Sequence, residues 1–292
     1  MTAVAPAPRA LLSVEALSGT IGSVVRGIDL RDIDAEHAAV IRSLLVDRKV
    51  LFFPRQGLSP AELTEFAAAF GELTPAHPVL PGLDGHPHVL EVDATRSRQD
   101  PRYRDEYEND TWHADVTFMA TPPLGSILQA EALPPAGGDT LFADLQAAYE
   151  TLSTPLRRLI EELTAVHDGR HEFAKFLAAN PAGGVWDGER FTELRPVIHP
   201  VVRTHPESGV PGLFVNPTFT SRIVELAAGE SQSLLELLYA HATAPERVVR
   251  WHWSVGDIAF WDNRSTLHYP VRDYGDHHRL MRRVTVRGSK PY

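Results

Sequence analysis

The sequence predicts a mainly β protein with peripheral helices around a β-sandwich or jelly-roll core. Short runs rich in β-branched and aromatic residues recur along the chain, each bounded by Gly, Pro or Asp. Helical patterns are confined to a few segments and do not alternate with the strands, which argues against a doubly wound parallel sheet. The chain shows no internal repeat and no low-complexity linker, so we expect a single domain over 11–292 after a disordered Ala/Pro-rich tail at 1–10.

Strands are expected wherever apolar and β-branched residues cluster between turn residues. These runs are KVLFFP (49–54), GSILQA (125–130), DTLFA (139–143), HPVVRTH (199–205), GLFVN (212–216), RVVRWHW (247–253), DIAFW (257–261) and RRVTVRG (282–288). Regularly recurring short strands of this kind are typical of an all-β core.

Three segments carry helix signals. The segment 59–70 begins with Ser59 and Glu62 at capping-box spacing and continues with an apolar stripe of period 3.6. A similar stripe of Leu and Ile residues runs through most of 154–167, and leucines at helical spacing mark 230–241. We expect these helices to pack on the outside of the β core.

Composition and charge exclude several classes of function. The absence of cysteine removes disulfides, thiolate nucleophiles and Cys-based metal sites, so a metal must bind His, Asp or Glu. A formal net charge of −10 argues against a nucleic-acid surface. No apolar run approaches the length of a membrane span or a secretory signal. We therefore expect a cytoplasmic protein that binds neither nucleic acid nor membrane.

Among the 14 histidines, His113 has a carboxylate two residues away, Asp115, in TWHADVTF. On an extended segment this spacing points both side chains to one face. His268 follows a β-prone run near the far end of the chain. Two histidines and one carboxylate leave coordination positions open, as a non-haem Fe(II) centre requires, although zinc can use the same three ligands.

The motifs WHADVTF (112–118), GGDT (137–140) and WDNR (261–264), followed by His268 and by RLMRR (279–283), resemble the TauD/TfdA family of Fe(II)- and 2-oxoglutarate-dependent oxygenases. The resemblance extends from about residue 21 to residue 291 and includes VLFFPRQ, FGEL, HPVVRTHP and LFVN in the same order. It implies a double-stranded β-helix, a cupin-like jelly roll. It also implies that His113, Asp115 and His268 bind Fe(II), with 2-oxoglutarate and O2 as co-substrates.

The same resemblance assigns roles to further residues. Arg279 matches the position that binds the distal carboxylate of 2-oxoglutarate, Thr140 a position that donates to that carboxylate, and Arg283 the position that binds the substrate's sulfonate. The remaining matched pocket positions are His77, Leu80, Asn109, Phe173 and Phe219. Leu80 stands where taurine-oxidising members have a tyrosine, which puts taurine itself in doubt because a polar contact is missing.

The expected reaction is hydroxylation of the carbon next to a sulfonate, which releases sulfite and an aldehyde together with succinate and CO2. The alternative substrate is an alkyl sulfate ester, which would release sulfate. A zinc hydrolase and a non-catalytic anion-binding module are the competing classes, and dependence on O2 separates the oxygenase from the hydrolase. The polar segment 98–110 is a candidate lid, and family members commonly form dimers or tetramers.

Overall fold

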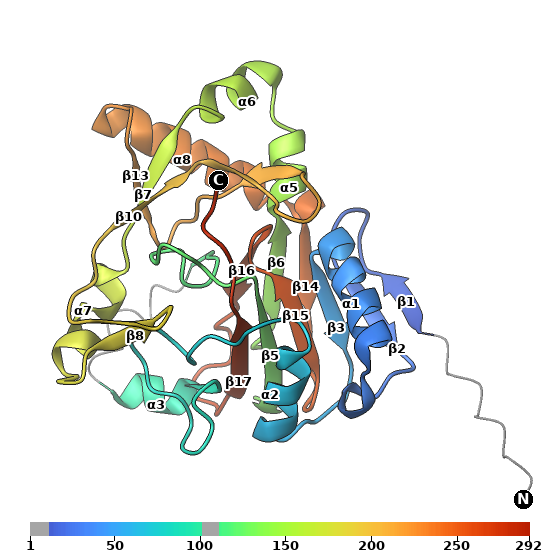
Figure 1. Ribbon diagram of the computed structural model, residues 1–292. Coiled ribbons are helices and arrows are strands. Elements are labelled where there is room, and N and C mark those ends of the chain that lie inside the picture. The colour runs from blue at the N-terminus through green and yellow to red at the C-terminus, as the bar shows by residue number, and fades with distance from the viewer. Residues whose placement is uncertain (1–11, 101–110) are drawn as a thin grey trace, which may run out of the picture.

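The computed structural model describes residues 12–100 and 111–292, and two sheets lie at its centre (Figure 1). The larger sheet has seven strands in the order β1-β2-β3-β15-β5-β17-β4, and the smaller has the order β14-β6-β16. The larger sheet comprises β1 (Ser13–Ala16), β2 (Ser23–Arg26), β3 (Val50–Phe53), β15 (Ile258–Asp262), β5 (Gly125–Ala132), β17 (Leu280–Val286) and β4 (Leu90–Asp93). The smaller comprises β14 (Val248–Trp251), β6 (Thr140–Asp144) and β16 (Thr266–Pro270). All neighbouring pairs are antiparallel except β2–β3.

The buried strand β3 shows that the larger sheet is covered on both of its faces. Val50 and Phe52 belong to the apolar cluster that also contains Phe142 of the smaller sheet. Leu51 and Phe53 belong to a second cluster, on the opposite face. Because successive side chains of a strand point to opposite faces, a strand covered on both faces needs a continuous apolar run. VLFF meets that requirement, and all four of its residues are buried.

Two helices, α1 (Ala35–Arg48) and α2 (Pro60–Ala68), cover the outer face of the larger sheet. Ile41 of α1 and Phe66 of α2 are buried in that second cluster. The predicted capping box at the start of α2 is confirmed: the Ser59 hydroxyl accepts from the Glu62 N–H, and the Glu62 carboxylate accepts from the Ser59 N–H. The helices therefore close the core on the side away from the smaller sheet.

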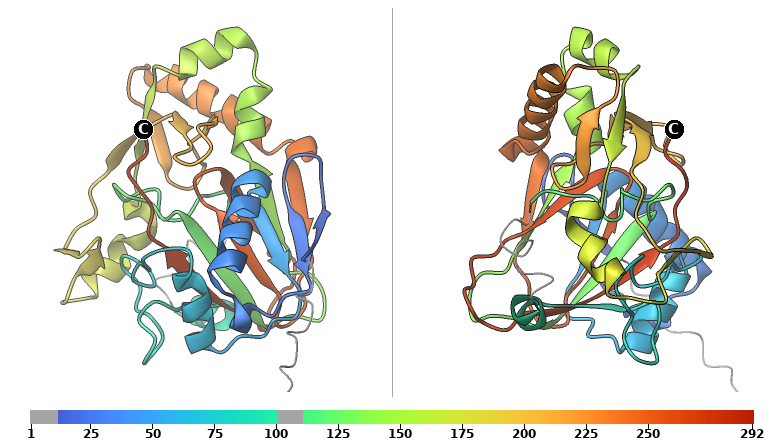
Figure 2. Two further views of the ribbon diagram at one scale, coloured as in Figure 1. Left: turned by 45° about the vertical axis from the view of Figure 1, so that its right-hand side comes forward. Right: turned by 90° about the vertical axis from the view of Figure 1, so that its left-hand side faces the viewer.

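The remaining elements gather at the other end of the molecule and along one side (Figures 1 and 2). A third cluster packs α5 (Leu145–Glu150), α6 (Thr154–Ile160) and α8 (Ala228–Ala242) around the sheet β10-β7-β13 (Val197–Pro200, Thr164–His167, Thr220–Ile223) and the hairpin β11–β12 (Val202–Thr204, Pro211–Leu213). The other elements are η1 (Leu30–Asp32), α3 (Ala94–Gln99), α7 (Arg170–Ala178), β8 (Gly184–Trp186), β9 (Glu189–Phe191) and η2 (Pro245–Arg247). Among the described residues, no helix has the length and apolar character needed to cross a membrane.

The mainly β class with peripheral helices is confirmed. The sequence missed several elements, and two segments show why. The predicted helix over 154–167 is wrong after Ile160, because Thr164–His167 forms the central strand β7 between β10 and β13. Helix α1 was not predicted at all. Its buried side chains are essentially Ile41 and Leu45, one turn apart, which is too narrow a stripe to stand out.

Several expectations fall wholly or partly outside the described residues. The tail at 1–10, Asn109 and residues 101–110 of the candidate lid are among them. Within the described part of the predicted loop, Arg98 and Gln99 belong to the short helix α3. The single domain over 11–292 stays a prediction.

Candidate active site

The two histidines of the predicted triad meet across an isolated antiparallel bridge. The His113 N–H donates to the His268 carbonyl at 3.0 Å, and the His268 N–H donates to the His113 carbonyl at 2.8 Å. The ring centroids lie 4.1 Å apart. His268 is on β16 of the smaller sheet, so this bridge fastens the segment around His113 to that sheet.

Asp115 reaches the same point by a route that the sequence did not predict. The extended segment ends at His113, and Asp115 begins a turn in which Val116 has a φ of 57°. A β-branched residue in the left-handed region is strained, by about 1–3 kcal/mol. Asn263 holds this turn in place, because its side-chain amide accepts from the Asp115 N–H at 2.7 Å and donates to the Asp115 carbonyl at 2.8 Å.

The donor atoms fit a metal ion. His113, Asp115 and His268 each offer one ligand atom, and these atoms lie within 4.8 Å of one another. The Thr111 carbonyl lies 2.9 Å from His113 Nδ1, which assigns the proton to Nδ1 and leaves Nε2 to coordinate. Nδ1 of His268 is buried and has no hydrogen-bond partner among the described residues. Two imidazoles and one carboxylate on one side of an ion are the ligand set of a non-haem Fe(II) centre.

The Asp115 carboxylate is charged and has a partner on each oxygen. The Ser126 hydroxyl donates to Oδ2 at 2.6 Å, and Arg283 Nη1 lies 2.5 Å from Oδ1. Burial by itself would raise the pKa of Asp115, but the Arg283 guanidinium holds it well below its usual range. Burial above all lowers the pKa of His268 well below its ordinary value, so this imidazole is neutral and able to bind a metal.

A cavity of about 210 Å³ joins the two histidines to Thr140 and Arg279. Arg279 is buried, and its Nε donates to the Gly138 carbonyl at 3.1 Å. Gly138 has a φ of 74°, and a Cβ there would lie 3.2 Å from the Arg279 side chain, so glycine suits this position. The Thr140 hydroxyl accepts from the Trp253 indole N–H at 3.0 Å and keeps its own proton to donate.

A second cavity, of about 130 Å³, is also lined by His113 and Arg283. Its walls include the predicted pocket residues His77, Leu80, Phe173 and Phe219, together with Asp115. The two cavities share His113, Glu172, Phe173 and Arg283. The structure thus brings together every predicted site residue that it describes.

His77 is a neutral hydrogen-bond donor in this second cavity. Its Nδ1 accepts from the N–H groups of Val79 at 3.1 Å and Leu80 at 3.2 Å, so the ring proton is on Nε2. Burial, helped by the positive charge of Arg283, lowers the pKa of His77 to about 3. The residue therefore stays uncharged at neutral pH and can donate to an anion without itself being a cation.

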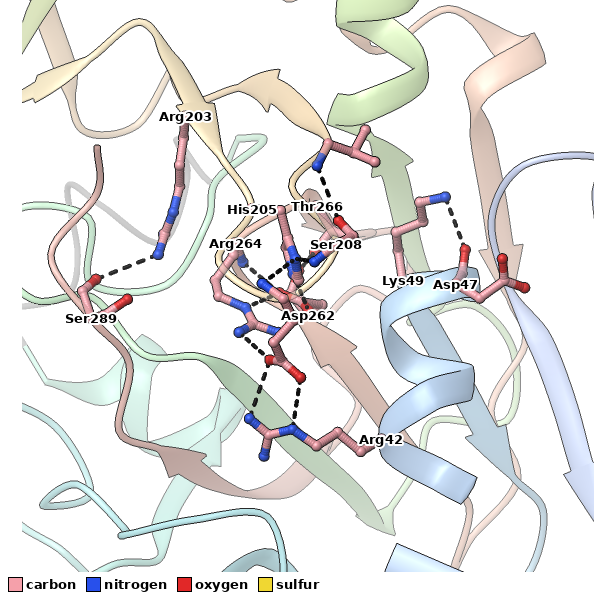
Figure 3. A network of polar contacts seen from close by, with 12 residues as sticks. Arg42, Asp47, Lys49, Arg203, His205, Ser208, Asp262, Arg264, Thr266 and Ser289 are labelled. Carbon is pink, nitrogen blue, oxygen red and sulfur yellow. Dashed lines mark hydrogen bonds and ion pairs between the residues drawn. The ribbon is translucent and has the colours of Figure 1, made fainter. Parts of the chain in front are cut away.

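Sequence reasoning missed three residues that shape the site: Ser126, Trp253 and Asn263. Each is buried and acts on a residue more than ten positions away. Asn263 lies in the WDNR motif, which was a usable signal. Its neighbour Asp262 is fixed by Arg264 and His205 in a buried network of polar contacts (Figure 3).

Comparison with known proteins identifies the family. The model of the family described as taurine catabolism dioxygenase TauD, TfdA family matches residues 13–285. The chain belongs to the TauD/TfdA family. An alpha-ketoglutarate-dependent sulfate ester dioxygenase from Pseudomonas putida is 40% identical over 99% of this chain and 94% of its own length. An alkylsulfatase from Acinetobacter baylyi is 36% identical over 99% of this chain and 89% of its own.

Solved structures agree with this assignment. The crystal structure of a taurine dioxygenase from Burkholderia xenovorans has a TM-score of 0.79 and 38% identity, and covers 97% of this chain and 93% of its own. The jelly-roll fold and the class of Fe(II)- and 2-oxoglutarate-dependent dioxygenase, both expected from the sequence, are confirmed for this TauD/TfdA member.

Proposed function

We propose that the protein oxidises a small organic sulfate ester at the carbon that bears the ester oxygen. Arg283 carries the proposal. Its guanidinium lines both cavities and contacts Asp115, and its Nε is buried with no hydrogen-bond partner among the described residues. A buried guanidinium with a free donor favours an anion beside it. Both relatives reported above are named for sulfate ester or alkylsulfatase activity.

Different residues would position the metal, 2-oxoglutarate and the substrate's sulfate. His113, Asp115 and His268 would hold Fe(II), and Arg279 with Thr140 would hold the distal carboxylate of 2-oxoglutarate in the 210 Å³ cavity. Arg283 and the Nε2 proton of His77 would bind the sulfate in the 130 Å³ cavity, whose walls include the apolar rings of Phe173 and Phe219. The bound metal, with 2-oxoglutarate and O2, supplies the oxidising power to hydroxylate a C–H bond.

The chemistry balances without a further reactant. One oxygen atom enters the C–H bond next to the ester oxygen and the other enters succinate, while 2-oxoglutarate loses CO2. The hydroxylated ester then breaks its C–O bond to sulfate, which leaves an aldehyde, sulfate and one proton. The protein contributes by fixing the anion so that this C–H faces the metal ligands, where small displacements are costly to rate.

An alkyl sulfonate is the second candidate substrate, and the similarity to a structure named taurine dioxygenase favours it. The same anion site would bind it, and the reaction would release sulfite in place of sulfate. Leu80 faces the cavity here, and an apolar side chain offers no hydrogen bond to an amino group such as that of taurine. This favours apolar organic groups on the sulfate or sulfonate.

The test is anaerobic reconstitution with Fe(II) and 2-oxoglutarate, followed by O2, alkyl sulfates or alkyl sulfonates. We expect succinate formation that is stimulated by an alkyl sulfate, equals the sulfate released, and is lost in His113→Ala. Sulfate release without O2 would instead support the hydrolase. Stimulation by no sulfate and no sulfonate, in protein that binds Fe(II), would refute the proposal.

The expected assembly rests on the family resemblance alone, and the expected location rests on the sequence. We expect a cytoplasmic dimer or tetramer, and analytical ultracentrifugation of the purified chain tests the first part.

A further inference from the structure

Two loops meet beside the 210 Å³ cavity that is assigned to 2-oxoglutarate. One is the turn at Gly137 and Gly138, which leads into β6 at Thr140. The other follows β16 after Pro270 and contains Asp273. Thr140 and Pro270 are paired across the two strands, and both line the cavity. The Gly138 N–H donates to Asp273 Oδ1 at 2.8 Å, so a side chain of one loop binds the backbone of the other.

Gly138 connects Asp273 to the arginine of the cavity. Its N–H donates to the Asp273 carboxylate, and its carbonyl accepts from Arg279 Nε at 3.1 Å. Because both groups belong to one residue, fixing the N–H also restrains the carbonyl. An arginine whose Nε is bound in this way has a fixed guanidinium plane, and a fixed plane favours bidentate binding of a carboxylate.

The turn comes very close to the Asp273 side chain. Gly137 has a φ of 79°, in the left-handed region that favours glycine, and a Cβ there would lie 2.9 Å from Asp273 Cγ. An alanine at position 137 would therefore displace the Asp273 carboxylate from the Gly138 N–H. The sequence GG at 137–138 thus suits both sides of the turn, since a Cβ at Gly138 would approach Arg279.

Arg250 of β14 joins the same two loops from the other side of β6. Its Nη2 lies 3.5 Å from Asp273 Oδ2, and its Nε lies 2.6 Å from Asp139 Oδ2. The Val271 N–H donates to the Asp139 carbonyl at 2.9 Å, which adds a backbone link between the loops. Asp273 and Arg250 are both about half-exposed, so removing the Asp273 carboxylate leaves no buried charge behind.

We propose that Asp273 is a positioning residue for 2-oxoglutarate, which acts through Gly138 to fix Arg279 in the orientation that binds the distal carboxylate. Asp273 does not itself line the cavity, so its effect must pass through Gly138 and Arg279. This inference rests on the proposed function, because it takes Arg279 as the residue that binds the co-substrate.

The test compares binding of 2-oxoglutarate with turnover. Anaerobic calorimetry of the Fe(II) enzyme gives the Kd of 2-oxoglutarate, and the alkyl sulfate assay gives its KM. We expect Asp273→Ala to raise both by about tenfold, the usual size of a lost charge-assisted hydrogen bond, and to change kcat at saturating 2-oxoglutarate less than twofold. Asp273→Asn keeps an oxygen that can accept from the Gly138 N–H, so it should retain most of the affinity.

A double-mutant cycle tests the path through the turn. Gly137→Ala should raise the Kd of 2-oxoglutarate in the wild-type chain, but much less in Asp273→Ala, where the carboxylate that it would displace is gone. Asp276→Ala is the matched control. It removes an exposed carboxylate three residues further along the same loop, which lies 3.9 Å from Arg98 Nε, and should keep the wild-type Kd. Thermal unfolding identifies any variant that fails to fold.

The outcomes separate this inference from the function on which it rests. If Arg279→Gln weakens binding of 2-oxoglutarate but Asp273→Ala does not, the inference is wrong and the role of Arg279 stands. Equal losses in Asp273→Ala and Asp273→Asn, or in Asp273→Ala and Asp276→Ala, would also overturn it. If Arg279→Gln has the wild-type Kd, the role of Arg279 and the inference are both wrong. If Asp273→Ala weakens binding as expected but no sulfate or sulfonate is turned over, the inference stands and the proposed substrate is wrong.

Discussion

Two buried aspartates, Asp115 and Asp262, lie near each other in the fold and are used in opposite ways. Both carboxylates are nearly inaccessible to solvent, and burial by itself would raise the pKa of each. In both, an adjacent arginine reverses this and holds the pKa well below its usual range: Arg283 for Asp115 and Arg264 for Asp262. What differs is how completely the surroundings are paired.

The donors that contact the Asp262 carboxylate itself are fully paired. Arg264 contacts both carboxylate oxygens, His205 Nε2 lies 3.0 Å from Oδ2, and Glu207 joins Arg264 to Arg42 of α1 (Figure 3). Around Asp115, by contrast, nitrogen atoms of His268 and Arg283 are buried and unpartnered among the described residues. The hydrogen bonds of the Asp262 carboxylate are complete and stabilise the fold. The groups around Asp115, in contrast, can still bind a metal and an anion.

Truncating the complete cluster should have the largest effect on stability. Asp262→Ala leaves the Arg264 guanidinium buried without its main partner, so we expect a loss of about 3–5 kcal/mol in the free energy of unfolding. Urea denaturation measures it. The matched change, Asp115→Ala, should abolish Fe(II) binding. Its loss of stability should be smaller, because the Arg283 side chain is 11% exposed and can be hydrated, whereas that of Arg264 is 4% exposed. Equal losses in the two variants would contradict the comparison.

Replacing Arg283 should weaken the binding of the substrate's anionic group. Arg283→Gln removes the charge that faces the sulfate, and we expect kcat/KM for an alkyl sulfate to fall by an amount equivalent to about 2–5 kcal/mol. Steady-state kinetics at saturating 2-oxoglutarate tests this. Its neighbour on the same strand, Arg282, contacts Glu131 at 3.1 Å instead, so Arg282→Gln should leave kcat/KM unaffected. A similar loss in both variants would refute the assignment.

A smaller effect is expected for Ser126, whose hydroxyl donates a hydrogen bond to the metal-ligand candidate Asp115. Ser126→Ala removes the donor to Asp115 Oδ2, and Fe(II) affinity should fall by about 10–100-fold, the usual result of losing such a support. Competition with a metal chelator measures the affinity. Ser231→Ala removes another buried hydroxyl, which accepts from the Ile223 N–H far from the site, and should change only stability. Unchanged Fe(II) affinity in Ser126→Ala would contradict the supporting role.

The smallest expected effect is the dependence of the free energy of unfolding on pH. Burial lowers the pKa of His77 to about 3 and that of His199 to about 4, both below the ordinary value of 6.5. The unfolded chain therefore binds more protons below pH 6.5, and the free energy of unfolding should fall as the pH is lowered from about 6.5 to 4. Each histidine contributes up to about 1.4 kcal/mol per pH unit. Denaturation curves across this range test the slope, and His199→Gln should reduce it; an unchanged slope would contradict the neutral form of His199.

Several core strands could be predicted from the sequence because local patterns determine them. Runs such as 50–53 are apolar on both faces, and the strand β3 appears there. Thr164–His167 could not be predicted, because its place between β10 and β13 depends on partners from elsewhere in the chain. At that segment, tertiary pairing outweighed a good helical pattern.

In the site, too, some residues could be predicted from the sequence and others could not. His113, Asp115 and His268 were found through a short motif and a family resemblance, and Arg279 and Arg283 through the same resemblance. The turn at Asp115 was not foreseen, since its geometry depends on the side chain of Asn263 far along the chain. A single sequence does not show which distant residues contact each other in the fold. The contributions of Ser126 and Trp253 to the site could therefore not be predicted either.

The bridge between His113 and His268 also has a thermodynamic consequence for metal loading. In an unfolded chain these residues are the ends of a loop of about 155 residues, and bringing such ends together costs about 5 kcal/mol of chain entropy. The disordered chain therefore offers almost no chelate, and the ion discriminates strongly between the folded and unfolded states. By linkage, metal at 100 times its Kd stabilises the native state by about 2.7 kcal/mol. Uptake of the ion thus reports that the two halves of the polypeptide have already assembled.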